Sequence, residues 1–323
     1  MLGVDEEGRA GDVVARAHAL SGAAADAAGI AVREVHELAD CAAVRRLVDT
    51  VWSADPTNPS VTAELLRAYT HTGQYVVVAD DLTRPGRPVV AASAAWLSAP
   101  AGLALHSHVT GVLPEGRGRS LGFALKAHQR AWALERGLQE ITWTFDPLIR
   151  RNAWFNLAKL GARPREYLVD FYGAMADGVN AGDASDRLYL SWRLADPVVD
   201  AALRGAPRVV DVAAERAAGA VAALAVDGGG VPALAWPPPS DVATALVQVP
   251  PDIETLRRAE PALGRAWREA LRTALHGALA DGWSVRGVGR DGWYVLDAPG
   301  ADQGAGQGAD RVGADDDERE DGR

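Results

Sequence analysis

The segment GVLPEGRGRSLGFAL, residues Gly111–Leu125, decides the fold of this chain. Three glycines and two arginines stand within the seven residues Gly116–Gly122, between an apolar run and an amphipathic one. Glycine lets the backbone approach a ligand closely, and the free N–H groups at the start of a helix attract anions. Arg117 and Arg119 add forked positive charge. The pattern predicts a strand, an anion-binding turn and a helix; the alternative is a tight turn whose arginines face solvent.

Two common nucleotide-binding turns do not fit this segment. A P-loop ends in Gly-Lys-Ser or Gly-Lys-Thr, which is absent here. A dinucleotide-binding turn follows the first strand of its unit and precedes, by about 20 residues, an acidic residue that binds ribose. Here the turn follows the fourth predicted strand, and Glu140 enters a strand rather than ending one.

The residues around the turn predict an α/β domain over residues 30–195, built on a mixed sheet. Apolar residues at helical spacing predict helices, and strand-like runs bounded by turn residues predict strands. The predicted order is β-α-α-β-β-β-α-β-α-β-β, with helices at 38–52, 60–71, 120–137 and 150–161, and strands at 30–37, 74–80, 88–98, 102–112, 140–145, 167–173 and 186–194.

The other segments differ in composition. Residues 1–29 are rich in alanine and glycine, and we expect them to be disordered. Residues 196–240 read as an Ala/Gly/Pro-rich connector with room for one hairpin or helix. Residues 241–297 predict a strand, helices and a hairpin, an αβ extension too small for its own core, which we expect to pack on the main sheet. The tail, residues 298–323, is predicted to be disordered and acidic.

Composition excludes several classes of function. The net charge is −10, with eight acidic and three basic residues in 301–323, so nothing resembles the basic face of a nucleic-acid-binding protein. The chain has no apolar run long enough for a membrane span and no signal peptide pattern, so we expect a cytoplasmic protein without a membrane partner. The single cysteine, Cys41, excludes an internal disulfide and a thiolate zinc site, and we predict no metal.

The glycine-arginine turn resembles the coenzyme A pyrophosphate loop of the GNAT superfamily of N-acetyltransferases. Val112 and Pro114 match the V-x-P that leads into that loop. Arg117 matches its first motif position and Gly122 its last glycine, whereas Ser120 replaces the middle glycine. The family places this loop after its fourth strand, as the predicted order does here.

Further short runs narrow the resemblance to a little-characterised branch described as predicted acetyltransferases with a C-terminal extension. The runs are HSHVTGV, KAHQRAWAL, ITWTFDPL, RNAWFNLAKLGA, YLVDFYG and SDRLYLSW. The resemblance implies an α/β (α+β) fold with a mixed, mostly antiparallel sheet flanked by helices.

The resemblance also implies acetyl-CoA, or another acyl-CoA, as cofactor. In the family the fourth strand near Val112 binds pantetheine and supplies an oxyanion donor, the loop binds pyrophosphate, and an asparagine after the fifth strand contacts the cofactor arm. The residues expected to bind the cofactor are Val112, Arg117, Gly118, Arg119, Ser120, Leu121, Gly122, Asn152 and Asn156.

Candidate catalytic residues follow from the chemistry of amine acylation, in which a base must take a proton from the amine. His106 and His108 stand two apart on the fourth strand, and the alternative is that they are structural. Asp146 ends the fifth strand, as a proton relay or as the cap of the next helix. The family's general-acid tyrosine is replaced by Leu157, which leaves Tyr167 or Tyr172 as candidates.

Acceptor binding is the least determined part of the site. Asp186 and Arg187 are candidates to clamp an acceptor with both amine and carboxylate, or else form a self-bonded turn. Trp143 is a candidate pocket wall or a core residue. We expect an N-acyltransferase that acts on a small-molecule amine such as an amino acid and transfers acetyl or another small acyl group such as succinyl. Whether the chain forms a homodimer is left open. The alternatives are an acyl-CoA-binding sensor without activity and a nucleotide-binding protein.

Overall fold

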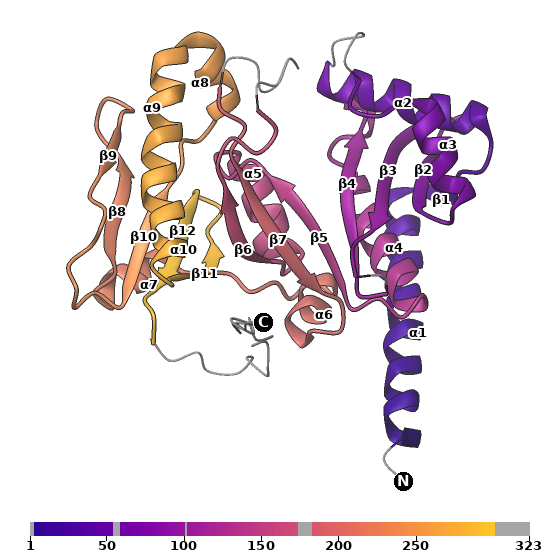
Figure 1. Ribbon diagram of the computed structural model, residues 1–323, viewed down its shortest axis with the longest axis horizontal. Helices are drawn as coiled ribbons and strands as arrows, with labels where there is room; N and C mark the ends of the chain where they lie inside the picture. The colour runs from indigo at the N-terminus through magenta and orange to yellow at the C-terminus, as the bar shows by residue number, and fades with distance from the viewer. Residues whose placement is uncertain (1–2, 54–58, 101, 174–182, 301–323) are drawn as a thin grey trace, which may run out of the picture.

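The computed structural model describes residues 3–53, 59–100, 102–173 and 183–300. A seven-stranded sheet has the order β1-β2-β3-β4-β5-β7-β6 (Figure 1). Neighbouring strands are antiparallel except β4 and β5, which are parallel. The strands are β1 (Ile30–Glu34), β2 (Tyr75–Asp81), β3 (Val89–Leu97), β4 (Ala104–Val112), β5 (Glu140–Phe145), β6 (Arg163–Leu168) and β7 (Arg187–Arg193).

Helices cover both faces of this sheet. On one face, α2 (Leu38–Trp52) and α3 (Ala63–His71) bury apolar side chains against β2 and β3. On the other face lie α1 (Gly3–Ala28), α4 (Leu121–Glu135) and α5 (Arg150–Ala153), which continues into the π-helical turn η2 (Trp154–Lys159). The mixed, mostly antiparallel sheet flanked by helices confirms the predicted fold class.

One predicted strand is displaced along the chain. The run 167–173 was expected to be extended, but β6 begins at Arg163 and ends at Leu168. Pro164 makes this stretch look like a loop, yet β6 is an edge strand, where a residue without an N–H is tolerated.

The expectation of a disordered N-terminus is wrong for residues 3–28, which form α1. This helix lies along α4 in Figure 1. Ala17 and Ala28 are buried in the interface, so small side chains let the two helices approach closely. Low hydrophobicity suggested disorder, but alanine also has the highest helix propensity, and docking on α4 stabilises the helix. None of the helices within the described ranges combines the length and apolar character needed to cross a membrane.

The C-terminal part builds a second, five-stranded sheet in the order β11-β12-β10-β8-β9. Its strands are β8 (Val221–Val226), β9 (Pro232–Leu234), β10 (Thr244–Gln248), β11 (Ser284–Val288) and β12 (Trp293–Asp297). Its helices are α6 (Pro197–Leu203), α7 (Val212–Ala217), α8 (Ile253–Ala259) and α9 (Pro261–Leu271), which continues through η3 (Arg272–His276) into α10 (Gly277–Ala280).

This second sheet corrects the predicted domain limits. Residues 196–240 are not only a connector, because β8 pairs in parallel with β10 and brings β9 with it. The extension therefore has a sheet of its own, which was not predicted from the sequence, and it also packs on the first sheet. Trp267, Leu271 and Tyr294 of the extension share one buried cluster with Trp143 and Leu188 of the first sheet. The predicted acidic tail lies outside the described residues from 301 onward.

Candidate functional site

The first sheet opens between its two parallel strands. β4 and β5 pair only through Ala104–Glu140, Leu105–Ile141 and His106–Thr142, and beyond these pairs the strands diverge (Figure 1). β5 keeps its pairing with β7 and β4 keeps its pairing with β3 up to Val112, so the sheet divides between β4 and β5 into two paired parts. The register of β4 against β3 also shifts, because His108 has no partner there. Backbone groups of β4 beyond His106 are therefore available to an extended ligand.

The glycine-arginine turn lies at the end of this opening. β4 is followed by the short 3-10 turn η1 (Pro114–Gly116), and α4 begins at Leu121. Gly118 and Ser120 both have positive φ, 81° and 62°. Serine is strained in this left-handed conformation, whereas glycine is not.

Five successive amides of this turn, from Gly118 to Gly122, donate to no acceptor within the described part of the chain. The next two amides, of Phe123 and Ala124, donate to the carbonyl of Ser120 and start the helix. Free amides at the positive end of a helix are an anion-binding arrangement. The predicted strand, turn and helix are confirmed, and binding of a phosphate by the turn stays a prediction.

The two arginines of the turn have different surroundings. Arg119 donates to both carboxylate oxygens of Asp81, at 2.6 and 2.9 Å, and to the carbonyl of Ala28 at 2.8 Å. These hydrogen bonds hold the pKa of the Asp81 carboxyl below its usual range. The Arg119 side chain therefore ties the turn to β2 and the end of α1, so its guanidinium group is not a cofactor ligand in this arrangement, and a contact of its backbone amide with the cofactor stays a prediction. Arg117 is exposed and has no such partner among the described residues.

The histidines of β4 lie among aromatic side chains. The ring of His106 is 5.3 Å from that of Trp96 and 6.4 Å from that of Tyr189, and its Nδ1 is 3.1 Å from the hydroxyl of Thr142. Burial, together with the nearby His108 and Lys126, lowers the pKa of His106 to about 4. His108 lies 4.7 Å from Trp96, and burial also lowers its pKa. Both imidazoles are thus neutral at pH 7 and able to accept a proton.

On the opposite face of the opening lies a buried lysine that sequence reasoning missed. Lys126 of α4 is 5% exposed, and its amine donates to Ser107 of β4 at 2.9 Å and to Gln129 at 3.0 Å. The amine also lies 4.0 Å from the centre of a Trp143 ring. No carboxylate pairs with it in the described part of the chain, and burial lowers its pKa to about 7. The rarity of lysine, with only Lys126 and Lys159 in the chain, was the available signal.

Two other predicted residues belong to this buried face. Trp143 is 5% exposed, packs edge-on against Trp192 and donates to Asn156 at 3.3 Å. Its role as a wall of the acceptor pocket is therefore wrong, and core packing is right. Asn156 is buried and accepts this bond, while Asn152 is half-buried, and a contact of either with the cofactor stays a prediction.

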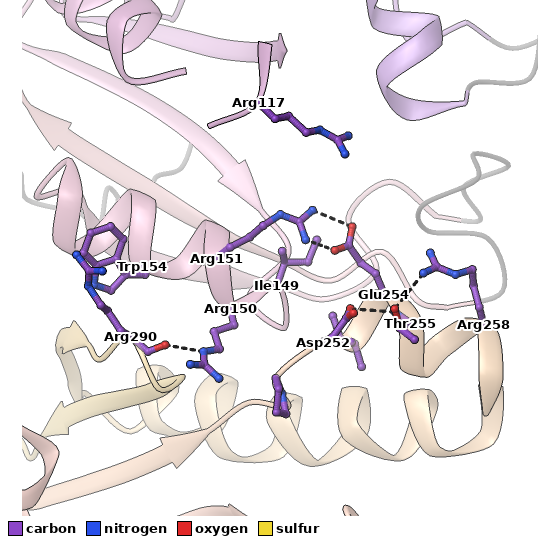
Figure 2. Close-up of a pocket in the computed structure, with 12 residues that line it drawn as sticks. Arg117, Ile149, Arg150, Arg151, Trp154, Asp252, Glu254, Thr255, Arg258 and Arg290 are labelled. Carbon is purple, nitrogen blue, oxygen red and sulfur yellow. Dashed lines mark hydrogen bonds and ion pairs between the residues drawn. The ribbon is translucent and has the colours of Figure 1, made fainter. Parts of the chain in front are cut away.

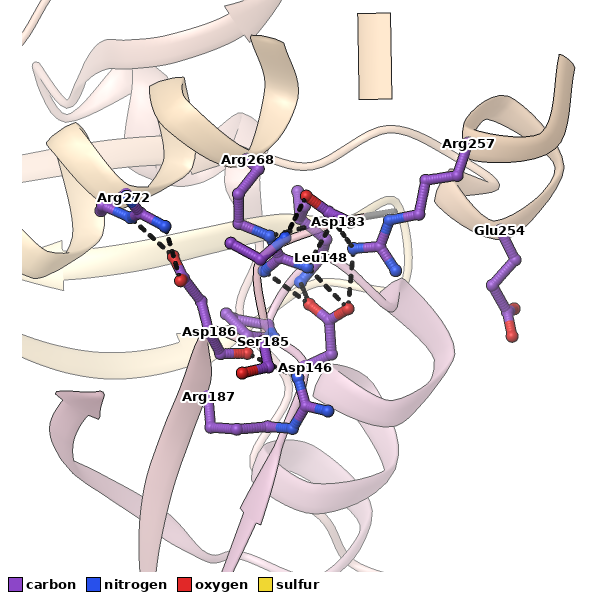
Figure 3. Close-up of polar contacts among 12 residues, drawn as sticks. Asp146, Leu148, Asp183, Ser185, Asp186, Arg187, Glu254, Arg257, Arg268 and Arg272 are labelled. Atoms are coloured by element: carbon purple, nitrogen blue, oxygen red, sulfur yellow. Dashed lines mark hydrogen bonds and ion pairs between the residues drawn. The ribbon is translucent and has the colours of Figure 1, made fainter. Parts of the chain in front are cut away.

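Asp146 is surrounded by arginines of the extension (Figure 3). Arg268 donates to both of its carboxylate oxygens at 2.9 Å, and Arg257 donates at 2.8 Å. Burial alone would raise the pKa of Asp146, but the two guanidinium groups hold it well below the usual range. The carboxylate also accepts the amide of Leu148, the capping role considered above. A carboxylate paired in this way does not take up protons near neutral pH, so the predicted proton relay is wrong.

Asp186 is also paired with an arginine of the extension. Arg272 donates to it at 2.9 and 2.7 Å (Figure 3), and the hydroxyl of Tyr167 donates to it at 2.7 Å. Arg187 is also buried and donates to the carbonyl of Asp186 at 2.9 Å. The predicted acceptor clamp is therefore wrong for Asp186, which is fully buried. Tyr172 is 41% exposed, with its hydroxyl 3.0 Å from that of Thr144, and it remains a candidate acid.

A pocket of about 830 Å³ lies beside the glycine-arginine turn (Figure 2). Its lining comes from the turn, the start of α5, the start of α8 and the turn between β11 and β12. We call it the arginine pocket, because its lining includes Arg117, Arg150, Arg151, Arg258 and Arg290. Sequence reasoning missed it, since these arginines come from four separate segments.

No protein-family model and no curated protein matches the sequence. Solved structures do resemble it. A putative acetyltransferase of the GNAT family from Desulfovibrio desulfuricans is 17% identical over 51% of this chain and 99% of that one, with a TM-score of 0.42. The structure of yncA, a putative acetyltransferase from Salmonella typhimurium with its cofactor acetyl-CoA, is 16% identical over 54% of this chain and 99% of that one, with a TM-score of 0.40. At these identities the likeness concerns the fold alone.

Proposed function

We propose that this chain is an acyl-CoA-dependent N-acyltransferase that transfers acetyl, succinyl or another small acyl group directly to a small amine such as an amino acid. One observation carries the proposal: the opening between β4 and β5 leads to the five free amides of Gly118–Gly122. An extended chain ending in a pyrophosphate is complementary to both parts at once, because a strand edge binds an extended chain and free amides bind an anion.

The fit to acyl-CoA extends to individual groups. The amides of Gly118–Gly122 and the guanidinium group of Arg117 would hold the pyrophosphate. The open edge of β4 up to Val112 would hold the pantetheine arm. When bound, acyl-CoA supplies an activated thioester, so the chain itself has to position an amine and move protons.

Proton transfer from the amine is assigned to the histidines of β4. An alkyl ammonium has a pKa of about 10 and must lose a proton before it can attack. His106 is neutral at pH 7 and oriented by Thr142, and His108 lies beside it on the bulged part of β4. Tyr172 is assigned as the donor of a proton to the departing thiol. Its hydroxyl lies 3.0 Å from that of Thr144, and Thr144 faces the same side of β5 as Thr142, which contacts His106.

A panel of acyl-CoA thioesters with pooled amines tests this proposal by release of free thiol. We expect turnover with at least one acyl group and one amine class. His106→Ala and His108→Ala should reduce kcat while leaving CoA affinity unchanged, since general-base catalysis contributes roughly 100- to 10,000-fold. His71→Ala, at an exposed position on α3, is the matched control. Unchanged kcat in both variants would contradict the assignment of the base.

Leu157 favours a second candidate function. It is buried, 7% exposed, at the position where the family carries its general-acid tyrosine. The alternative is an acyl-CoA-binding sensor without activity. Stabilisation of the protein by CoA, with no thiol released from any thioester in the panel, would select the sensor. Stabilisation by ATP or NAD in place of CoA would exclude both candidates.

A further inference from the structure

The arginine pocket carries more positive charge than its own carboxylates neutralise. Arg151 pairs with Glu254 of α8, and Asp252 is the other acidic residue of the lining (Figure 2). Five arginines against two carboxylates leave an excess of three positive charges around about 830 Å³. Such a concentration of like charge attracts an anion to the pocket.

Two of the arginines belong to the extension and present their guanidinium groups at the pocket. Arg258 of α8 donates to the hydroxyl of Thr255 at 3.1 Å. Arg290, in the turn between β11 and β12, lies 4.2 Å from the centre of a Trp154 ring. Neither forms an ion pair within the described ranges, and both are exposed. Their charged ends therefore remain available to a ligand without loss of an existing ion pair.

The first sheet supplies the opposite wall. The Nε of Arg150 donates to the backbone carbonyl of Arg290 at 2.6 Å, which joins the start of α5 to the extension and leaves the terminal nitrogens of Arg150 available. Arg117 belongs both to the anion-binding turn and to the pocket lining. The arginine pocket therefore begins at the turn whose amides would bind the pyrophosphate.

Coenzyme A carries two separate anionic groups, a pyrophosphate and a phosphate on the 3′ hydroxyl of its ribose. The second is a dianion with three acceptor oxygens, which arginine forks bind well. We propose, on the basis of the proposed function, that the arginine pocket binds the 3′-phosphate of coenzyme A. The extension then determines the preference for coenzyme A over 3′-dephospho-coenzyme A.

The test compares the affinity of the full chain for CoA and for 3′-dephospho-CoA by calorimetry, without any acceptor present. We expect dephospho-CoA to bind roughly tenfold to a hundredfold more weakly, the effect of losing one or two charge-assisted hydrogen bonds. In the double variant Arg258→Ala, Arg290→Ala the ratio of the dissociation constants for dephospho-CoA and CoA should fall toward one. Affinity for dephospho-CoA itself should barely change.

The matched control removes the same charge elsewhere on the extension. Arg216 also lies over a tryptophan, 4.6 Å from the ring of Trp293, and Arg265 is an exposed residue of α9. The double variant Arg216→Ala, Arg265→Ala should keep the wild-type ratio. Arg117→Ala should weaken both ligands together, because it faces the pyrophosphate.

The outcomes distinguish a failure of the pocket assignment from a failure of the proposed acyltransferase function. Equal affinity of the wild type for the two ligands would overturn the pocket assignment while leaving the acyltransferase proposal intact. A wild-type preference that survives in the Arg258→Ala, Arg290→Ala variant would overturn it as well. Failure of both ligands to bind would overturn the proposed function together with the inference.

Discussion

Replacing Lys126 with methionine tests whether the chain holds a buried amine with a lowered pKa beside β4. The side chain is buried and bonded to Ser107 and Gln129, and no carboxylate in the described residues compensates its charge. Methionine has a similar length and no titratable group, so it fills the same space under the Trp143 ring. The variant therefore removes the proton equilibrium of this site with little change in packing.

The size of the effect follows from the two pKa values. The amine has a pKa of 10.5 in the unfolded chain and about 7 in the folded one. Between these values the unfolded chain binds more protons, so stability increases as the pH rises from 7 to 10.5. At about 1.4 kcal/mol per pH unit this gives ~2 kcal/mol between pH 7 and 9. Attraction of the charged amine to Trp143 opposes this, leaving about 1–2 kcal/mol.

The assay is urea unfolding of the wild type and Lys126→Met at pH 7, 8 and 9. The difference in unfolding free energy between the two proteins cancels every other titrating group. Relative to the variant, the wild type should gain about 1–2 kcal/mol from pH 7 to pH 9. Lys159→Met, at a half-buried lysine, should show a smaller change. Parallel pH curves for the wild type and Lys126→Met would refute the reasoning.

Three further predictions follow from the site. The double variant Arg117→Ala, Gly122→Glu should lose CoA binding yet fold, because a Cβ at Gly122 meets only Phe155 at 4.0 Å while the new carboxylate repels phosphate; unchanged affinity by thermal shift would contradict the loop assignment. If His106 is the base, the acid limb of the kcat/KM profile should have an apparent pKa near 4; a limb near 6.5 would point to another group. Asp146→Asn should destabilise the chain by about 3–5 kcal/mol, because it leaves the carboxylate of Asp183 alone between the two buried guanidinium groups of Arg257 and Arg268, and chemical denaturation measures this; a loss below about 1 kcal/mol would contradict this buried network.

The turn and its place in the sheet were predictable because their signals are local. The glycines, the apolar run before them and the amphipathic run after them lie within one segment, Gly111–Leu125. The same holds for the histidine pair of β4, whose spacing places both residues on one strand.

The roles of the charged residues were not predictable, because their partners are distant in the sequence. Asp146 and Arg268 are 122 positions apart, and Asp186 and Arg272 are 86 apart. A carboxylate at a strand end looks catalytic until the arginine that neutralises it is known. Non-local pairing likewise concealed β8, whose parallel partner β10 follows only after β9 and a loop.

The contacts between the first sheet and the extension have a consequence for how this chain can change over evolution. The Arg268–Asp146 pair is buried, the half-buried Arg272 pairs with the buried Asp186, and the apolar cluster runs from one sheet to the other without interruption. A substitution at Arg268 therefore affects two carboxylates of the first part of the chain at once, because Arg268 pairs with both Asp146 and Asp183. The extension therefore cannot be exchanged between homologues by itself. The first sheet and the extension have to be exchanged together.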